Sequence, residues 1–158
     1  MSVPFVHLHL HTEYSLVDGI VRVKPLVKAV AAAGMPACAV TDQNNLFALV
    51  KFYKAAIGAG IKPIVGADVW VHNAQDPNQP GRLVLLCQDR DGYLNLNELI
   101  SRSYIDGQHR GVPVVQKDWL HDHSAGLIAL SGGRAGDVGL ALLAGNTVLA
   151  GELLEDRK

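Results

Sequence analysis

Apolar and polar residues alternate over residues 3–10, and this period of two is typical of a β-strand. From residue 21 to residue 33 the apolar positions recur at helical spacing, and Gly34 is placed to end that helix. The two patterns then take turns along the rest of the chain. The predicted strands are residues 3–10, 37–42, 62–71, 82–89 and 126–133, and the predicted helices are residues 21–33, 46–60, 91–106, 135–145 and 146–156.

Strands that alternate with helices predict an α/β fold with a parallel sheet covered by helices, either open or closed toward a barrel. The polar residues favour the barrel, because several of them follow separate predicted strands, and barrel enzymes gather their sites at the carboxyl ends of strands. These residues are His9, His11, Asp42, Asp68 and the turn 131–133. Two capping predictions complete the pattern: Asn44 or Asn45 before the helix 46–60, and Asp118 in the short segment after the apolar residues 112–115.

Composition limits the classes of protein that the chain can represent. Its 158 residues fit one domain, and 49% hydrophobic with 18% charged residues argue against disorder. A net charge of -1 gives no overall basic footprint, so this chain is not expected to hold nucleic acid by itself.

Cys38 and Cys87 lie inside apolar runs without the close spacing of a zinc ribbon, so both are expected to be buried thiols in a reducing cytosol. No apolar run approaches the roughly 18 residues that a membrane span needs. We therefore expect a cytoplasmic protein with no membrane contact.

Three histidines at alternate positions, His7, His9 and His11, share one face if residues 3–10 form a strand. Two imidazoles that project the same way can bind one Zn, Mn or Fe ion, and Asp18 could complete the ligand set. The pattern also fits histidines that line a polar strand face. In the same way, Asp18 could belong to a turn, Asp42 could cap the following helix, and Asp68 could be a solvated strand end.

No other catalytic motif competes with the metal hypothesis. Neither a phosphate-binding G-x-x-x-x-G-K pattern nor a G-x-S-x-G nucleophile elbow occurs in the sequence.

Five blocks in a fixed order resemble the PHP (polymerase and histidinol phosphatase) domain at the N-terminus of bacterial DNA polymerase III alpha subunits. The blocks are HLHLHTEYSLVDG, TDQNNLFALVKFY, GIKPIVGAD, LLCQDRDGYLNL and GLIALSGGRAGDVG. The resemblance implies a distorted, TIM-like barrel of parallel strands and helices. It also implies that residues 1–158 are the N-terminal part of that domain, ending before its last strands, within a larger polymerase chain.

Family members with an intact site hold a cluster of three Zn, Mn or Fe ions. The resemblance assigns His9, His11 and Asp18 to the first ligand motif. Four other ligand positions depart from the family: Gln43 stands for histidine, Asp68 for glutamate, Arg82 for histidine and Gly133 for cysteine. We expect a degenerate site, in which the Arg82 guanidinium pairs with Asp18 or Asp68 in place of a metal. A single residual Zn or Mn at His9 and His11 stays open as an alternative.

The resemblance further implies a module of a replicative DNA polymerase that supports the remainder of the alpha chain and docks the proofreading exonuclease subunit. The polymerase reaction, its Mg and its DNA contacts would belong to the parent chain, and no catalytic residue is expected in this fragment. The alternative is a free-standing, metal-dependent phosphoesterase of the histidinol-phosphatase kind.

Overall fold

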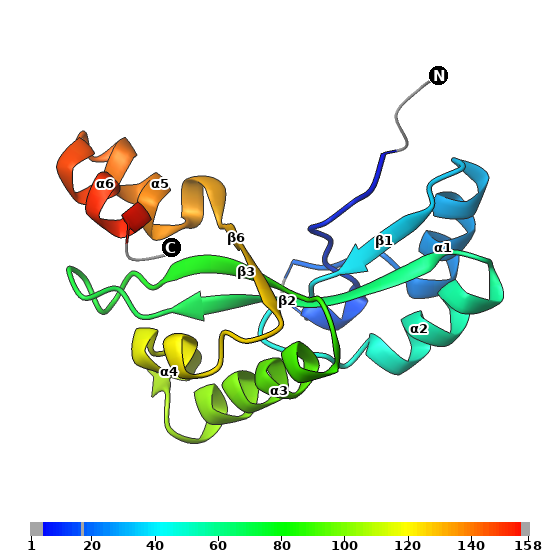
Figure 1. Cartoon of the computed structure of the whole chain (residues 1–158), viewed down its shortest axis with the longest axis horizontal. Helices are drawn as coiled ribbons and strands as arrows, with labels where there is room; N and C mark the ends of the chain where they lie inside the picture. Colours follow the sequence, from blue (N-terminus) through cyan, green and yellow to red (C-terminus); the bar gives the residue numbers. More distant parts are fainter. Residues whose placement is uncertain (1–4, 17, 156–158) are drawn as a thin grey trace.

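The computed structural model describes residues 5–16 and 18–155 of the chain, and it combines six strands with flanking helices (Figure 1). The strands are β1 (Ala37–Val40), β2 (Lys62–Val71), β3 (Gly81–Cys87), β4 (Gln108–His109), β5 (Val112–Val115) and β6 (Leu127–Ser131). The α-helices are α1 (Val23–Ala32), α2 (Leu49–Gly58), α3 (Arg90–Ile105), α4 (Lys117–Asp122), α5 (Asp137–Leu143) and α6 (Thr147–Glu155); the 3-10 helices are η1 (Glu13–Ser15) and η2 (Gly133–Ala135).

The sheet is mixed, with the strand order β4-β5-β2-β3-β6, and β1 pairs with the first half of β2. The α/β class is thus confirmed, and β1, β2 and β5 are parallel as expected. The expectation of parallel strands fails for β3, which is antiparallel to both β2 and β6. Residues 72–80 join β2 to β3 without a helix, and so short a connection can form only a hairpin.

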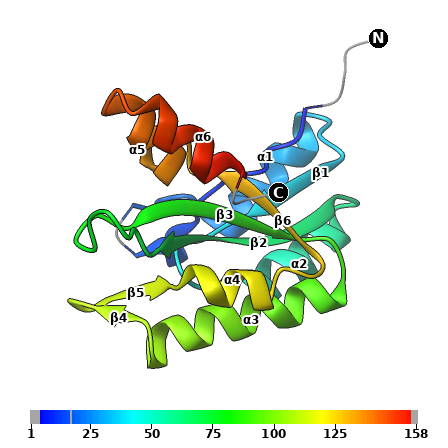
Figure 2. The same cartoon turned by 60° about the vertical axis from the view of Figure 1, so that its left-hand side comes forward.

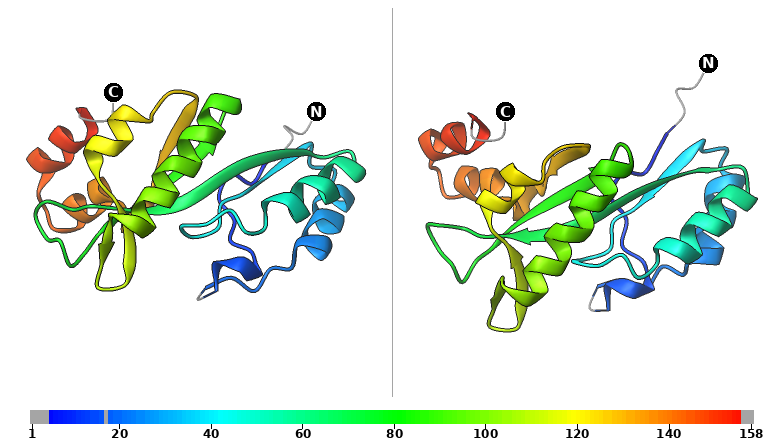
Figure 3. Two further views of the ribbon diagram at one scale, coloured as in Figure 1. Left: turned by 90° about the horizontal axis from the view of Figure 1, so that it is seen from below. Right: turned by 60° about the horizontal axis from the view of Figure 1, so that its bottom comes forward.

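Helices cover both faces of the sheet. On one side, α1 and α2 pack against β1 around Val27, Cys38 and Phe52, while α3 packs against β2, β3 and β5 around Val69 and Leu96 (Figure 3). The pair α5–α6 lies on the opposite side of β3 from α3 and α4 (Figure 2). No helix in residues 5–16 and 18–155 is long and apolar enough to cross a bilayer.

The two cysteines differ in burial. Cys38 is buried in the core, as predicted, whereas Cys87 ends β3 and is only half-buried, which corrects the second prediction. Both are free thiols. Burial, assisted by the charge of Asp89, raises the pKa of Cys87 to about 11, so this thiol is a poor nucleophile at neutral pH.

Helix ends follow the sequence in part. Gly34 adopts φ +67° and ends α1, with its amide donating to Ala31 O, as expected of a glycine after a helix. The cap predictions were wrong in detail. The residue directly before α2 is Ala48. The Asn45 side chain accepts a hydrogen bond from the Phe47 amide in the loop before the helix. Asp118 lies inside α4, in its first turn.

The N-terminal segment lies beside β1 but is not a regular strand, and residues 3 and 4 of the predicted strand lie outside the described residues. The amides of Ala39 and Thr41, two residues apart, donate to the carbonyls of His7 and Leu10, three residues apart. The segment therefore carries one extra residue relative to β1, as in a bulge. His9 and His11 both reach Asp68, whereas the His7 ring contacts Phe5.

Alternation along β2 and β3 separates two faces of the sheet. Val69 and Leu83 point to the core beneath α3, so their neighbours Asp68 and Arg82 point to the opposite face. Asp68 lies inside β2 and not at its end, because β2 continues to Val71. This position within β2 brings Asp68 under the N-terminal segment.

Candidate functional site

Asp68 is the centre of the candidate site, and its side chain is 0% exposed. One carboxylate oxygen, Oδ2, lies 3.0 Å from His9 Nε2 and 3.1 Å from His11 Nε2. The same oxygen is 3.6 Å from Arg82 Nη1. Three cationic or hydrogen-bonding groups thus compensate a carboxylate that burial alone would destabilise.

His11 bridges two carboxylates. Its Nδ1 lies 2.9 Å from Asp18 Oδ1, and its Nε2 faces Asp68. Because both ring nitrogens face acceptor oxygens, both must carry protons for both bonds to form. The hydrogen bond to Asp68 raises the pKa of His11 against the opposing effect of burial, and Asp18 adds to the increase. This hydrogen-bonding geometry therefore favours the imidazolium form of His11.

Arg82 lies between the two acidic groups. Its Nη2 donates to Gln43 Oε1 at 2.6 Å and lies 3.4 Å from Asp18 Oδ2. The expected partner was Asp18 or Asp68, and the guanidinium contacts both. Burial raises the pKa of Asp18, but the bonds from His11 and Arg82 outweigh it and lower that pKa below its ordinary value. The guanidinium lies 4.8 Å from the centre of the Trp70 ring.

Trp70 was not anticipated from the sequence. It is the cross-strand neighbour of Arg82 in the register of β2 and β3, and it follows Asp68 by two residues. The period of two along a strand places residues 68 and 70 on the same face, and this signal could have identified it. The flat ring supports the flat guanidinium and limits its orientations.

Gln43 lies in the loop between β1 and α2. It forms a parallel bridge with Asp68 of β2. Its amide nitrogen Nε2 has no partner among the described residues, and the same is true of Asp68 Oδ1 and Arg82 Nε. Such atoms cost free energy when buried, so the site is neutralised in charge but not fully satisfied in hydrogen bonds.

Gly133 is the one predicted ligand position that does not contact this group among the described residues. It begins η2 with φ +55°, and an added Cβ would meet no atom within 4 Å. Its neighbour Gly132 lies against the Arg82 backbone, where an added Cβ would come within 2.3 Å of the carbonyl oxygen. Space for a cysteine exists at residue 133, but the backbone conformation disfavours it.

Asp42 has a different role from the helix cap considered above. It is 1% exposed and accepts bonds from the amide and hydroxyl of Thr12 and from the Ser15 hydroxyl. The Ser15 hydroxyl in turn accepts the Gln43 amide. Asp42 therefore anchors the segment 12–15 to the end of β1, and that segment leads to Asp18.

The donor set can be compared with a metal centre. Ligand atoms of His9, His11 and Asp68 lie within 4.8 Å of one another, so these three side chains suit one ion. Asp18, assigned to the ligands from the sequence, is not in this group and instead pairs with His11 and Arg82. A cluster of three ions does not fit this group. The cluster would need the carboxylates of Asp18 and Asp68 as ligands, and the Arg82 guanidinium already contacts both.

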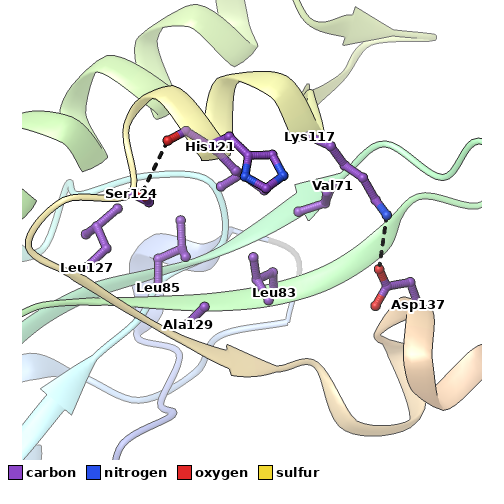
Figure 4. A pocket seen from close by; sticks show the side chains of 10 residues that line it. Val71, Leu83, Leu85, Lys117, His121, Ser124, Leu127, Ala129 and Asp137 are labelled. Atoms are coloured by element: carbon purple, nitrogen blue, oxygen red, sulfur yellow. Dashed lines mark hydrogen bonds and ion pairs between the residues drawn. The ribbon is translucent and has the colours of Figure 1, made fainter. Parts of the chain in front are cut away.

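A separate hollow lies on the other face of the sheet (Figure 4). It has a volume of about 220 Å³ between α4, β3, β6 and the start of α5. Leu83, Leu85 and Ala129 form its floor, and Lys117 pairs with Asp137 across its end at 3.9 Å. The alternation of β3 separates it from Arg82, so it is not part of the histidine site.

The fold is an α/β domain with a histidine-aspartate group on one face of its sheet, and a family model identifies its class: residues 7–157 match the PHP domain. The chain belongs to the PHP domain family. It is 55% identical over 157 residues to the DNA polymerase III subunit alpha of Pseudomonas fluorescens, covering 99% of this chain and 13% of that protein. It is 51% identical over 153 residues to the subunit of the same name from Escherichia coli K12, covering 96% and 13%.

The chain thus spans about 13% of the length of these curated relatives. Among solved structures, it is similar to a protein described as a metal-dependent phosphoesterase from Bifidobacterium adolescentis. The TM-score is 0.51 with 13% sequence identity, over 66% of this chain and 34% of the other. At this identity the likeness shows the fold alone, and it agrees with the PHP assignment.

Proposed function

We propose that this chain is the PHP module of a DNA polymerase III alpha subunit whose metal centre has been replaced by an internal ion-pair network. The observation that carries the proposal is the Arg82 guanidinium, 3.4 Å from Asp18 and 3.6 Å from Asp68. With His11 protonated, two cations face two carboxylates, and the group needs no metal to neutralise its charge. Its role is then to hold the N-terminal segment against β2 and β3.

Two physical effects oppose metal binding. Loss of an outer-shell partner alone typically weakens a metal site about 10- to 100-fold, so replacing ligands by Gln43, Arg82 and Gly133 has a larger effect. A fixed positive charge about 4 Å from a cation costs on the order of 4 kcal/mol per unit charge at an effective dielectric of about 20. Arg82 therefore both removes a ligand and repels the ion.

Within the parent chain, the module supports the polymerase and contributes a docking surface for the proofreading exonuclease subunit. The names and the identity of the curated relatives support the place in the polymerase chain. The docking of the exonuclease subunit is part of the proposal and rests on the family resemblance. Nucleotide addition, its Mg ions and its DNA contacts belong to parts of the polymerase outside these 158 residues.

The replacement of Arg82 by alanine in the complete polymerase tests the supporting role. We expect primer extension at low temperature to be preserved and the temperature of inactivation to fall, because the network stabilises the fold and does not take part in the reaction. Unchanged thermal inactivation, or a lost reaction in a fully folded protein, would show that the role is different.

Metal-dependent phosphoester hydrolysis is the second candidate function, and one observation favours it: His9, His11 and Asp68 still converge within 4.8 Å. The test is hydrolysis of p-nitrophenyl phosphate by the purified chain with added Mn or Zn. If the ion-pair network has replaced the metal centre, we expect no hydrolysis above background. A metal-dependent rate that disappears in His9→Ala would support the hydrolase.

A further inference from the structure

Charge is distributed unevenly along the chain. Residues 19–67 contain six lysines and arginines and one acidic residue, Asp42, whereas the rest of the chain contains eight basic and fourteen acidic residues. Asp42 is 1% exposed, so it adds no negative charge to the surface of this segment. The six basic residues are all exposed: Arg22, Lys24, Lys28, Lys51, Lys54 and Lys62.

These basic residues belong to one layer of the fold. Helices α1 and α2 pack side by side over β1 and share a single core (Figure 3). The buried side chains of α1, such as Val23 and Val27, face that core, so Lys24 and Lys28 lie on its solvent side. The basic charges are therefore presented by the outer surface of the α1–α2 layer.

Internal ion pairs neutralise only a part of this surface. Glu13 lies 3.5 Å from Lys51 and 3.9 Å from Arg22. Among the described residues, no acidic group lies within ion-pair distance of Lys24, Lys28, Lys54 or Lys62. Most of the positive charge is open to a partner.

A row of large apolar side chains runs through the same surface. Val50, Tyr53 and Ile57 are 64%, 50% and 56% exposed, and Phe47, just before α2, is 66% exposed. The spacing of three and four residues places the first three along one side of the helix. A shallow hollow at the end of this row is lined by Tyr53, Ile57, Ile61, Lys62 and Pro63.

We propose that the outer surface of the α1–α2 layer is a docking site for a partner protein that presents an acidic amphipathic helix. Apolar side chains of the partner, spaced by three and four residues, lie along Val50, Tyr53 and Ile57, with one of them in the hollow beside Pro63. Glutamates and aspartates flanking that row face Lys54 on α2 and Lys62 at the hollow. Lys24 and Lys28 extend the basic surface over α1. This surface is separate from the histidine site and does not depend on its metal content.

The apolar row decides between a protein and a nucleic acid as the occupant. Phosphate backbones are bound by basic and polar groups, with aromatic stacking on bases, and gain little from aliphatic side chains such as Val50 and Ile57. An amphipathic helix in a groove uses both features, since its apolar face covers the row and its charged flanks meet the lysines. Charge complementarity then sets orientation and the rate of association.

The test measures fluorescence anisotropy of a labelled 18-residue helical peptide with Leu at every third and fourth position and Glu between, added to the 158-residue chain. The reference is a peptide of the same composition in scrambled order. We expect the amphipathic peptide to bind at least about tenfold more tightly than the scrambled one, because only it can align its apolar face with the row. Equal binding of the two peptides would overturn the proposal, and so would no binding.

Variants separate the two contributions. Lys54→Glu with Lys62→Glu, and separately Val50→Ser with Ile57→Ser, should each weaken binding about tenfold or more. Arg90→Glu, an exposed charge reversal on α3, is the matched control and should leave binding unchanged. Circular dichroism of each variant verifies folding, since all five side chains are exposed.

Two further outcomes would replace the proposed partner by another. If a 20-nucleotide DNA binds more tightly than the peptide, and loses affinity in the lysine variant but not in the Val50→Ser, Ile57→Ser variant, the surface binds nucleic acid. If sedimentation shows self-association that the Val50→Ser, Ile57→Ser variant abolishes, the surface contacts a second copy of this chain.

Discussion

The Arg82 guanidinium lies 3.6 Å from the Oδ2 atom of Asp68, a carboxylate with no exposed surface. In the PHP family the corresponding positions are expected to hold metal ligands, and here a side-chain cation faces the acid directly. This contact is the geometric basis of the proposed replacement of the metal centre.

Removal of the guanidinium should therefore destabilise the domain. Arg82→Ala leaves Asp68 and Asp18 with fewer partners, and an unpartnered buried charge costs about 1 to 3 kcal/mol of unfolding free energy. Urea unfolding measures the change, with Arg90→Ala as the exposed control, expected within about 0.5 kcal/mol of the wild type. A change of Arg82→Ala within that same range would mean that the arginine is solvated and not structural.

The two titrating groups of the network give a pH signature. The pKa of His11 is raised above its ordinary 6.5, so its stabilisation is fully present below that pH and is lost as pH rises through the folded value. The pKa of Asp18 is lowered below 3.8, so its stabilisation is present above that pH and is lost as pH falls through the folded value.

The difference in stability between the wild type and His11→Gln should consequently be largest between pH 3.8 and 6.5 and should shrink above that window. Urea midpoints measured across the pH range determine it. His121→Gln, an exposed histidine on α4, serves as the matched control. A difference that stays constant with pH, or grows on the alkaline side, would contradict the bridging role of His11.

Asp42 should be a second point of stability. Asp42→Asn places an amide donor where three donors from Thr12 and Ser15 now converge, and a buried group left without its partner costs about 1 to 3 kcal/mol. Asp122→Asn, exposed at the end of α4, is the control. Thermal unfolding compares the two variants, and equal unfolding temperatures would rule out the anchoring of segment 12–15 by Asp42.

The edge of the sheet at β6 leads to a prediction about association. In the described residues β6 pairs with β3 and with no second strand, and such edges recruit other chains. We expect the fragment to dimerise, aggregate or exchange elements at high concentration, and Ile128→Lys to reduce this. Light scattering measures it, with Val148→Lys on α6 as the control. A wild-type chain that stays monomeric at high concentration would argue that the edge is protected.

Much of the fold was accessible from periodicity, because local patterns determine element type. The limits of β2 at residues 62 and 71 were predicted correctly, and Gly34 ends α1 as expected. The reversal at β3 was missed, since alternation along a strand carries no information on its direction. The bulge beside β1 was missed as well, because it depends on pairing with a distant segment.

The positions of the site were identified from the family resemblance. The expected pairing of Arg82 with an aspartate was inferred from the charges of these side chains. His9, His11, Asp18, Gln43, Asp68 and Arg82 were all named from the sequence, and the structure brings them together. Their hydrogen-bond partners could not be predicted, because strand register fixes them. Trp70 and the Asp42 contacts illustrate this, since each depends on a neighbour far away in sequence.

Restoration of the ligands should succeed only jointly. Gln43→His alone leaves Arg82 in place and should add little metal, whereas Gln43→His, Asp68→Glu, Arg82→His and Gly133→Cys together should raise the bound metal, because ligands of one site act as a unit. Gly133 has φ +55°, so the triple variant without the cysteine separates ligand supply from backbone strain. A full gain from Gln43→His alone would contradict the repulsion by Arg82.

Elemental analysis of the wild-type chain, purified without chelator, tests the replacement of the metal centre most directly. The ion-pair network predicts well under one equivalent of Zn, Mn or Fe per chain, because Arg82 and protonated His11 already neutralise Asp18 and Asp68. Two or three tightly bound metal ions per chain would contradict it and would show that other groups complete the cluster.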